Sequence, residues 1–187
     1  VSIGFFRMPK SDEWCVNTSR LMGVDSTDNE SLTKAEMDGR KQVEEIFRFL
    51  KKYVPGCENA HLTASGSYVG IRESRHIRGR YRLTLRDLMT NAHHPDTLYT
   101  CFSNYDPKGK VTADAVYCGC LPQQTAIEIP LSCLLPVDGQ GRPVAHLYVL
   151  GKAISASHDV FPSIRMQADL QHQGSILGSL IGRCVPL

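Results

Sequence analysis

Two groups of residues in this sequence could carry chemistry. Arg72 and Arg75 flank Glu73, and guanidinium groups bind carboxylates and phosphates through paired hydrogen bonds. The two arginines could therefore orient an anionic substrate, or form a buried ion-pair network with Glu73. Far along the chain, His158 follows the run Ile154–Ser157, and imidazole can move protons near neutral pH. His158 is a candidate catalytic group, with a purely structural histidine as the alternative.

The stretch around Arg72 is strongly basic. Six arginines fall between residues 72 and 86, with Glu73 as the one acidic residue among them. Such a stripe could line a groove for phosphates, but no ribonucleoprotein aromatic motif, zinc-finger spacing or basic zipper accompanies it, and the net charge is only +2. A solvated face with acidic neighbours, or a ligand surface, are the other interpretations. We expect no nucleic-acid partner.

Metal and disulfide chemistry have weak support in the sequence. Cys118 and Cys120 are separated by one residue with no second pair at zinc spacing, and the adjacent His93 and His94 resemble a metal site only superficially. The seven cysteines are odd in number and scattered, which indicates free thiols in a reducing compartment. No long apolar stretch or secretion signal is present, so we expect a cytoplasmic protein without a membrane span.

The first half of the sequence predicts one long helix and several strands. Apolar residues at helical spacing predict a helix over Thr33–Val54, with a capping box formed by Thr33 and Glu36. Residues 3–8 have the composition of a strand. Alternating arginines over Ile77–Thr84 predict a half-buried strand with its arginines on one face. A short helix should follow Thr84, capped through Asp87.

The second half predicts loops, short strands and a final helix. Residues 93–119 are rich in loop signals, with the strongest turn at residues 104–109. Strands are expected at residues 126–129 and 131–135, split by Pro130. A continuous apolar strand is expected over His146–Gly151, and a buried helix rich in small residues from about Ile164 onward.

Several stretches together resemble one family, the FAD-dependent oxidoreductases. Residues 70–81 resemble its G-x-R-E-S-R-x-I-x-G-x-Y element, and residues 147–174 resemble its returning flavin-binding segment, in which a strand ends in Gly and is followed by Ile-Ser-Ala-(Ser/Thr)-His and an Arg-led helix. Residues 16–20 and 129–136 are similar as well. Each element is moderately specific, but their joint order covers most of the chain.

The resemblance implies a glutathione-reductase-like fold, in which an N-terminal dinucleotide-binding unit precedes a largely β substrate domain and a C-terminal strand and helix return to the flavin. No G-x-G-x-x-G occurs here, and Gly139-Gln140-Gly141 is followed by Arg-Pro-Val. We therefore expect the C-terminal portion of a larger flavoprotein whose N-terminal FAD-binding part is missing, or a relative that has lost its nucleotide-binding half. The expected fold is α+β: a mainly antiparallel β substrate domain over residues 1–142 and a flavin-facing strand and helix over residues 143–187.

The resemblance also implies FAD as the cofactor and suggests which residues face it. A helix beginning near Arg165, Met166 and Gln167 would aim its free N–H groups at the flavin pyrimidine. Gly151 would allow close approach of the backbone, beside Ile154 and Ser155. His158, Arg72 and Arg75 are the expected catalytic residues.

Packing of this final helix rests on its glycines. Gly174 and Gly178 lie four residues apart and would permit close helix packing. The sequence departs from the family pattern where Ala168 replaces a frequent Pro and Ile176-Leu177 replace small residues, which leaves a core helix without cofactor as an alternative.

Two hypotheses of different classes follow. The first is part of an FAD-dependent oxidoreductase that transfers a hydride or electrons to or from a small-molecule substrate, inactive as this chain alone. The second is a non-catalytic binding or interaction module that retains the substrate-domain fold. The substrate and the electron acceptor do not follow from the sequence, and a homo-oligomer is compatible with it.

Overall fold

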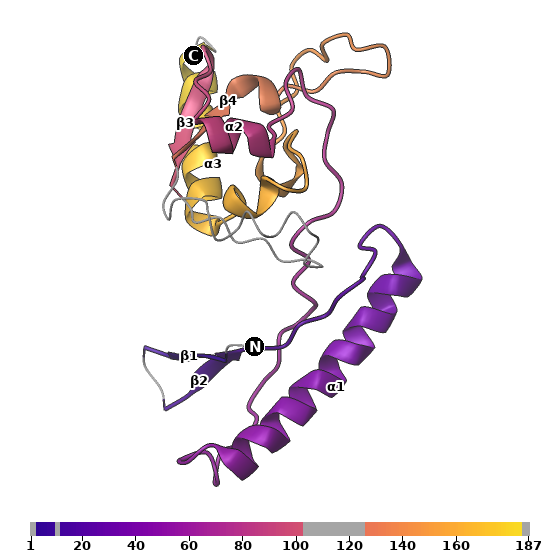
Figure 1. The fold of residues 1–187 in the computed structure, drawn as a ribbon, viewed down its shortest axis with the longest axis vertical. Coiled ribbons are helices and arrows are strands. Elements are labelled where there is room, and N and C mark those ends of the chain that lie inside the picture. The colour runs from indigo at the N-terminus through magenta and orange to yellow at the C-terminus, as the bar shows by residue number, and fades with distance from the viewer. Residues whose placement is uncertain (1–2, 10–11, 103–125, 185–187) are drawn as a thin grey trace. The chain divides into compact units, whose positions relative to one another are not determined.

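The structure, a computed structural model, describes residues 3–9, 12–102 and 126–184, which fall into two compact units, Val1–Ile71 and Arg72–Leu187. Over the described residues it contains three α-helices and two antiparallel sheets of two strands each (Figure 1). The mixed α+β class is thereby confirmed, and the described residues contain less strand than the expected β-rich substrate domain. The expected domain boundary after residue 142 stays a prediction.

The N-terminal unit opens with a short antiparallel ribbon. Strand β1 (Gly4–Arg7) pairs with β2 (Trp14–Asn17), and Phe5 lies opposite Val16 in the register. The expected strand at the start of the chain is confirmed. The side chains of Phe6 and Trp14 are exposed, so this ribbon buries little apolar surface of its own.

The long helix α1 spans Asn29–Tyr53 and confirms the predicted helix, but its start lies four residues before Thr33. The N-cap is Asp28, whose carboxylate accepts a hydrogen bond from the backbone N–H of Ser31 at 2.8 Å. The predicted capping box is wrong: Thr33 donates instead to the carbonyl of Asn29, and Glu36 accepts from the backbone N–H of Val69.

Polar contacts hold the rest of the N-terminal unit along α1. The backbone of Arg20 exchanges two hydrogen bonds with the Gln42 amide, and the Arg40 guanidinium reaches Ser65 and the carbonyl of Ser67. Figure 1 shows the chain before and after α1 running beside the helix.

The C-terminal unit contains the hydrophobic core. Strand β3 (Thr97–Cys101) pairs with β4 (Ile127–Pro130), and α3 (Gln167–Cys184) contacts β3. Helix α2 (Leu85–Thr90) adds Leu88 to the same core. The largest fully buried side chains of this core come from five segments of the unit: Leu83, Leu88, Cys101, Ile129, Leu134, Ile154, Val160, Phe161, Ile164 and Leu177.

The predicted strand over Ile77–Thr84 is wrong as a regular strand. The segment runs between two others, because Ile77 and Leu83 donate to the carbonyls of Ala153 and Ser155, while Arg80 donates to the carbonyl of Leu135. Only isolated bridges result, since neither neighbour is a straight strand. The predicted alternation of exposure is confirmed: Arg78, Arg80 and Arg82 are exposed and the residues between them are at least half-buried.

Three further predictions in this unit need correction. Residues Leu131–Cys133 form a 3-10 helix instead of a strand, and β3 lies in the stretch predicted as loop. No strand forms over His146–Gly151; Leu147, Tyr148 and Leu150 are exposed there. The predicted turn at residues 104–109 and the Cys118–Cys120 pair lie outside the described residues.

The predicted helices at both sides of the core are confirmed. Helix α2 follows Thr84 as expected, and the Asp87 carboxylate accepts hydrogen bonds from the Thr84 backbone at 2.7 Å and hydroxyl at 2.8 Å. It ends at Asn91 in the left-handed conformation, with φ 46°.

Helix α3 is confirmed as a helix but is not buried as predicted. Among the residues of α3 whose burial is described, 167–183, only Gln173 and Leu177 are fully buried, and a Cβ at Gly174 or Gly178 would meet no described atom within 4 Å. The close packing expected at these glycines is therefore not made within the described part of the chain. None of the described helices is both long and apolar enough to cross a membrane.

Candidate functional site

The carboxylate of Glu73 connects two histidines that come from distant parts of the sequence. Its Oε1 lies 2.9 Å from Nε2 of His76, and its Oε2 lies 2.6 Å from Nδ1 of His158. The side chains of Glu73 and His76 are 21% and 17% exposed, whereas that of His158 is 76% exposed. The cluster therefore has a sheltered half and an open half.

His76 is held from three sides. Its Nδ1 lies 2.9 Å from the backbone carbonyl oxygen of Ile154, and its ring meets Phe161 edge-on with the ring centroids 4.7 Å apart. The neighbouring Ile77 donates its backbone N–H to Ala153. Because a carbonyl oxygen can only accept, Nδ1 of His76 must carry a proton.

Close backbone contact requires a glycine next to this cluster. A Cβ on Gly79 would lie 2.7 Å from Cβ of Ser155 and 3.0 Å from the carbonyl oxygens of Ser132 and Tyr81. No larger residue fits without moving the backbone. Gly79 thus lets the segment that carries Glu73 and His76 lie against residues 153–157.

The predicted residues Ile154 and Ser155 lie in the core. Their side chains are 0% and 2% exposed, and the backbone N–H of Ser155 donates to the carbonyl of Cys133 at 3.0 Å. Their burial and this hydrogen bond fix the position of the segment that ends in His158. Direct contact of these two side chains with a cofactor stays a prediction that this packing does not favour.

The predicted arginines Arg72 and Arg75 are both exposed, so the buried ion-pair network considered for them is not formed. Further along the stripe, Asp138 has a lowered pKa because Arg142 donates hydrogen bonds to it, with a smaller contribution from the charge of Arg78. This acidic neighbour fits the interpretation of the stripe as a solvated face.

Gly151 and the start of α3 form the other predicted group. Gly151 adopts φ +77°, and its N–H donates to Oε1 of the buried Gln173 at 2.8 Å. A Cβ atom added at Gly151 would meet no described atom within 4 Å. Met166 and Gln167 are exposed and Arg165 is half-buried. The hydrogen bond to Gln173 holds the backbone of Gly151 in place, while the space that a Cβ would occupy is open.

A second polar cluster surrounds Asp87, which the sequence predicted as a cap together with Thr84 but without the contact to Tyr81. The Tyr81 hydroxyl donates to its Oδ1 at 2.8 Å. Burial and this hydrogen bond raise the pKa of Tyr81 to about 12. Burial acts to raise the pKa of Asp87, but hydrogen bonds from Tyr81 and Thr84 outweigh it and lower the pKa. The cluster fixes the extended segment to the start of α2.

Glu128 on β4 accepts hydrogen bonds from Thr97 Oγ1, the backbone N–H of His94 and Nδ1 of His93. These bonds, with Thr97 first, lower the pKa of Glu128 to about 2. His93, through its side chain, and His94, through its backbone N–H, thus form hydrogen bonds with the Glu128 carboxylate. Within the described ranges no group of three or more His, Cys, Asp or Glu side chains is arranged to hold a metal ion.

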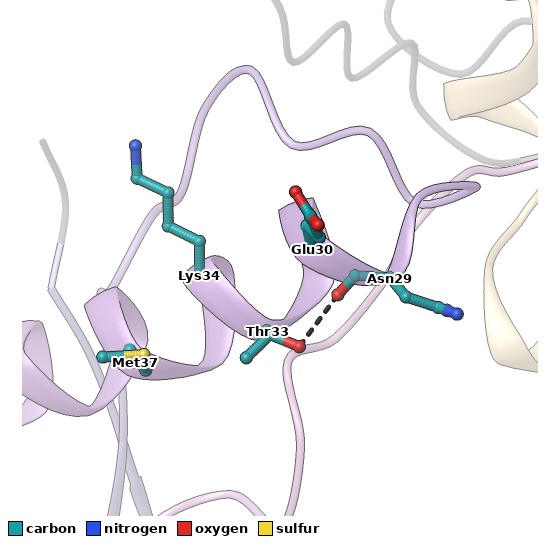
Figure 2. A pocket seen from close by; sticks show the side chains of 5 residues that line it. All are labelled: Asn29, Glu30, Thr33, Lys34 and Met37. Carbon is teal, nitrogen blue, oxygen red and sulfur yellow. Dashed lines mark hydrogen bonds between the residues drawn. The ribbon is translucent and has the colours of Figure 1, made fainter.

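A shallow depression lies on α1 in the N-terminal unit (Figure 2). Its lining residues come from the first turns of that helix: Asn29, Glu30, Thr33, Lys34 and Met37. Figure 2 shows Thr33 bonded back to the carbonyl of Asn29, while the Glu30 and Lys34 side chains point apart. It gathers no set of side chains that could act on a substrate, and we assign it no chemistry.

Comparison with known families agrees with the order of these segments. The model of a family described as FAD dependent oxidoreductase matches residues 3–185. The chain belongs to this family. Searches of curated proteins and of solved structures found no match. Membership of the FAD-dependent oxidoreductases implies FAD as the cofactor.

Two features of the described residues would suit contact with the flavin end of FAD. The first N–H groups of α3 have no partner within the helix, and Met166 and Gln167 beside them are exposed. Gly151 offers open space on a fixed backbone. The buried Ile154 and Ser155 side chains do not fit such a contact.

Sequence reasoning considered Glu73 only as a partner of Arg72 and Arg75, and it did not identify His76. The spacing of three residues between Glu73 and His76 was a usable signal, because a carboxylate and an imidazole at that distance can meet within one turn of chain. The contact to His158 spans 85 residues, and no local pattern indicates it.

Proposed function

We propose that this chain forms the substrate domain and the flavin-facing C-terminal part of an FAD-dependent oxidoreductase that transfers a hydride or electrons to or from a small molecule. The observation that carries the proposal is the Glu73 cluster, because it joins the Arg-Glu-Ser-Arg stretch to the segment ending in His158. These are the two stretches that most resemble the family pattern. When bound, FAD would act as the electron acceptor.

The start of α3 holds the flavin in this proposal. Arg165, Met166 and Gln167 surround the positive end of an 18-residue helix, which favours negative charge nearby. Gly151 lets the backbone approach closely, and Gln173 keeps that backbone in place. Ile154 and Ser155 contribute by fixing the chain between Gly151 and His158.

The substrate lies on the open side of the cluster. Arg72 and Arg75 are exposed and carry positive charge, so they orient an anionic group of the substrate. His158 is the exposed imidazole of the cluster and moves the proton. The stripe itself does not serve nucleic acid, since its companion motifs are absent from the sequence.

The adenine half of FAD binds to another stretch of polypeptide. The 187 residues contain no G-x-G-x-x-G, whose glycines let a backbone cradle the pyrophosphate. In this arrangement, residues 143–187 belong to the flavin-binding domain and residues 1–142 to the substrate domain. The glycine-motif part is therefore the main partner.

A pair of glycine substitutions tests the proposal in the protein that combines this chain with its glycine-motif part. Gly151→Val and Gly141→Val both place a side chain at positive φ in open space, so both cost similar backbone strain. Only Gly151→Val should reduce the FAD retained after gel filtration, by about tenfold or more, measured by flavin absorbance. Gly141→Val is the matched control.

Two results would contradict the proposal. A combined protein that stays colourless and does not take up FAD would favour the non-catalytic binding module. Equal FAD retention in both glycine variants would place the flavin away from Gly151 and α3.

A further inference from the structure

The hydrogen bonds of the Glu73 cluster fix where its protons lie. The backbone carbonyl of Ile154 accepts a hydrogen bond from the Nδ1–H of His76. A hydrogen bond between His76 Nε2 and Glu73 Oε1 therefore needs a second proton. That proton belongs either to an imidazolium beside a carboxylate or to a carboxylic acid beside a neutral imidazole. In both cases one proton lies between Oε1 and Nε2.

The remaining oxygen of Glu73 then acts as an acceptor. With the proton of the pair on the Oε1 side, Oε2 has none to donate, and its partner 2.6 Å away is Nδ1 of His158. Nδ1 of His158 must therefore carry the hydrogen of this bond. A neutral imidazole has one N–H, which leaves its Nε2 with a free lone pair.

The free nitrogen belongs to the exposed half of the cluster. The His158 side chain is 76% exposed, while the side chains of Glu73 and His76 are sheltered. No described residue forms a hydrogen bond with Nε2 of His158. The arrangement of a sheltered carboxylate, an oriented imidazole and an open nitrogen is that of a positioned general base.

We propose that Glu73 is a positioning residue that holds His158 in the Nδ1–H form, so that the exposed Nε2 accepts the proton of a substrate with an ionisable O–H or N–H on the carbon being oxidised. This rests on the proposed oxidoreductase function and narrows its substrate to alcohols or amines. Oxidation of such a carbon breaks its C–H and X–H bonds and forms C=X. FAD, when bound, would supply the hydride acceptor, and the X–H proton would go to Nε2 of His158.

The direct test is nitrogen-15 NMR of the histidine side chains in the full chain, at about pH 8, where a free imidazole is neutral. Wild type should show His158 protonated on Nδ1 and bare on Nε2. Glu73→Leu removes the acceptor and should convert His158 to a mixture of both forms. Glu128→Leu takes a carboxylate from His93 instead and should leave the His158 signal unchanged.

A conservative variant separates positioning from folding. In Glu73→Gln the amide oxygen can still accept from His158 Nδ1 while the amide N–H donates to His76 Nε2. This variant should therefore keep the Nδ1–H form of His158 even where Glu73→Leu fails to fold. Loss of that form in Glu73→Gln, or a wild-type His158 protonated on Nε2, would overturn the proposal.

Turnover separates this inference from the flavin assignment. In the FAD-loaded combined protein, Glu73→Leu should lower kcat on an alcohol or amine substrate by about 10²-fold with little change in KM, and Glu73→Gln should lower it less. The NMR result needs no flavin. A correct tautomer in a protein that never takes up FAD would leave the proton arrangement standing and contradict only the oxidoreductase assignment.

Discussion

The hydrogen bond between Tyr81 and Asp87 gives a pH signature at the scale of single residues. The pKa of Tyr81 is raised from 10.0 to about 12, because burial and the bond to Asp87 favour the neutral phenol. A group that is favoured protonated in the fold contributes stability that is complete below the unfolded pKa. This contribution is lost as the pH rises from about 10 towards about 12.

Tyr81→Phe removes this contribution. The substitution should lower the free energy of unfolding by about 1 kcal/mol at pH 8, because Asp87 loses one of its donors. The deficit should shrink between pH 10 and pH 12. Urea unfolding at both ends of this range measures it, with Tyr68→Phe as an exposed control. A deficit that stays constant with pH would show that the Asp87 bond does not govern the titration.

The site residues show what single positions reveal. Arginines are conspicuous in a sequence, and Arg72 and Arg75 drew attention on charge alone, yet both are exposed. Glu73, which lies between them in the sequence, is the residue that contacts both His76 and His158. His158 was predicted from the resemblance, but its partner could not be, because a contact over 85 residues depends on how the whole unit packs.

At the scale of elements, the start of α1 distinguishes the N-cap found in the structure, Asp28, from the capping residue predicted from the sequence, Thr33. Asp28→Ala removes the side chain that accepts from the Ser31 backbone and should cost about 1 kcal/mol of helix stability. Thr33→Ala removes a hydroxyl that bonds back to a helix carbonyl, so its cost should be near zero. Circular dichroism during thermal unfolding measures both.

The Asp28→Ala and Thr33→Ala variants can also contradict the assignment of Asp28 as the N-cap of α1. If Thr33→Ala destabilises more than Asp28→Ala, the helix begins at the capping box that the sequence predicted. Asn29→Ala is a suitable control, since its side chain lies in the first turn and provides no cap for α1.

The helices and the short strands β1 and β4 were predictable, whereas the strand expected over Ile77–Thr84 was not, for a physical reason. The pattern of α1 and the Thr84–Asp87 cap of α2 lie within the helix itself, so local sequence records them. The segment over Ile77–Thr84 has strand-like alternation, but a ladder also needs straight partners. Its neighbours are the irregular residues 132–137 and 153–157, so only isolated bridges form.

At the scale of the whole molecule, the two units differ in how they are stabilised. The cluster of buried side chains runs from Leu83 to Leu177, entirely within Arg72–Leu187. Helix α1 buries only Ala35 and Leu50 among its apolar residues. A helix within a protein gains most of its stability from packing of an apolar face, and α1 shares no buried side chain with the described core, so the two units should open independently.

Hydrogen exchange measures this difference directly. The amides of β3 and β4 should exchange at least about tenfold more slowly than those of α1, since opening them requires loss of the shared core. Leu177→Ala leaves a cavity in that core and should cost about 2–5 kcal/mol, speeding exchange in β3 and β4 while α1 is unchanged. Leu50→Ala is the matched change in α1 and should speed exchange there alone. If either substitution speeds exchange in both units alike, the chain unfolds as one cooperative body, which would contradict independent opening of the two units.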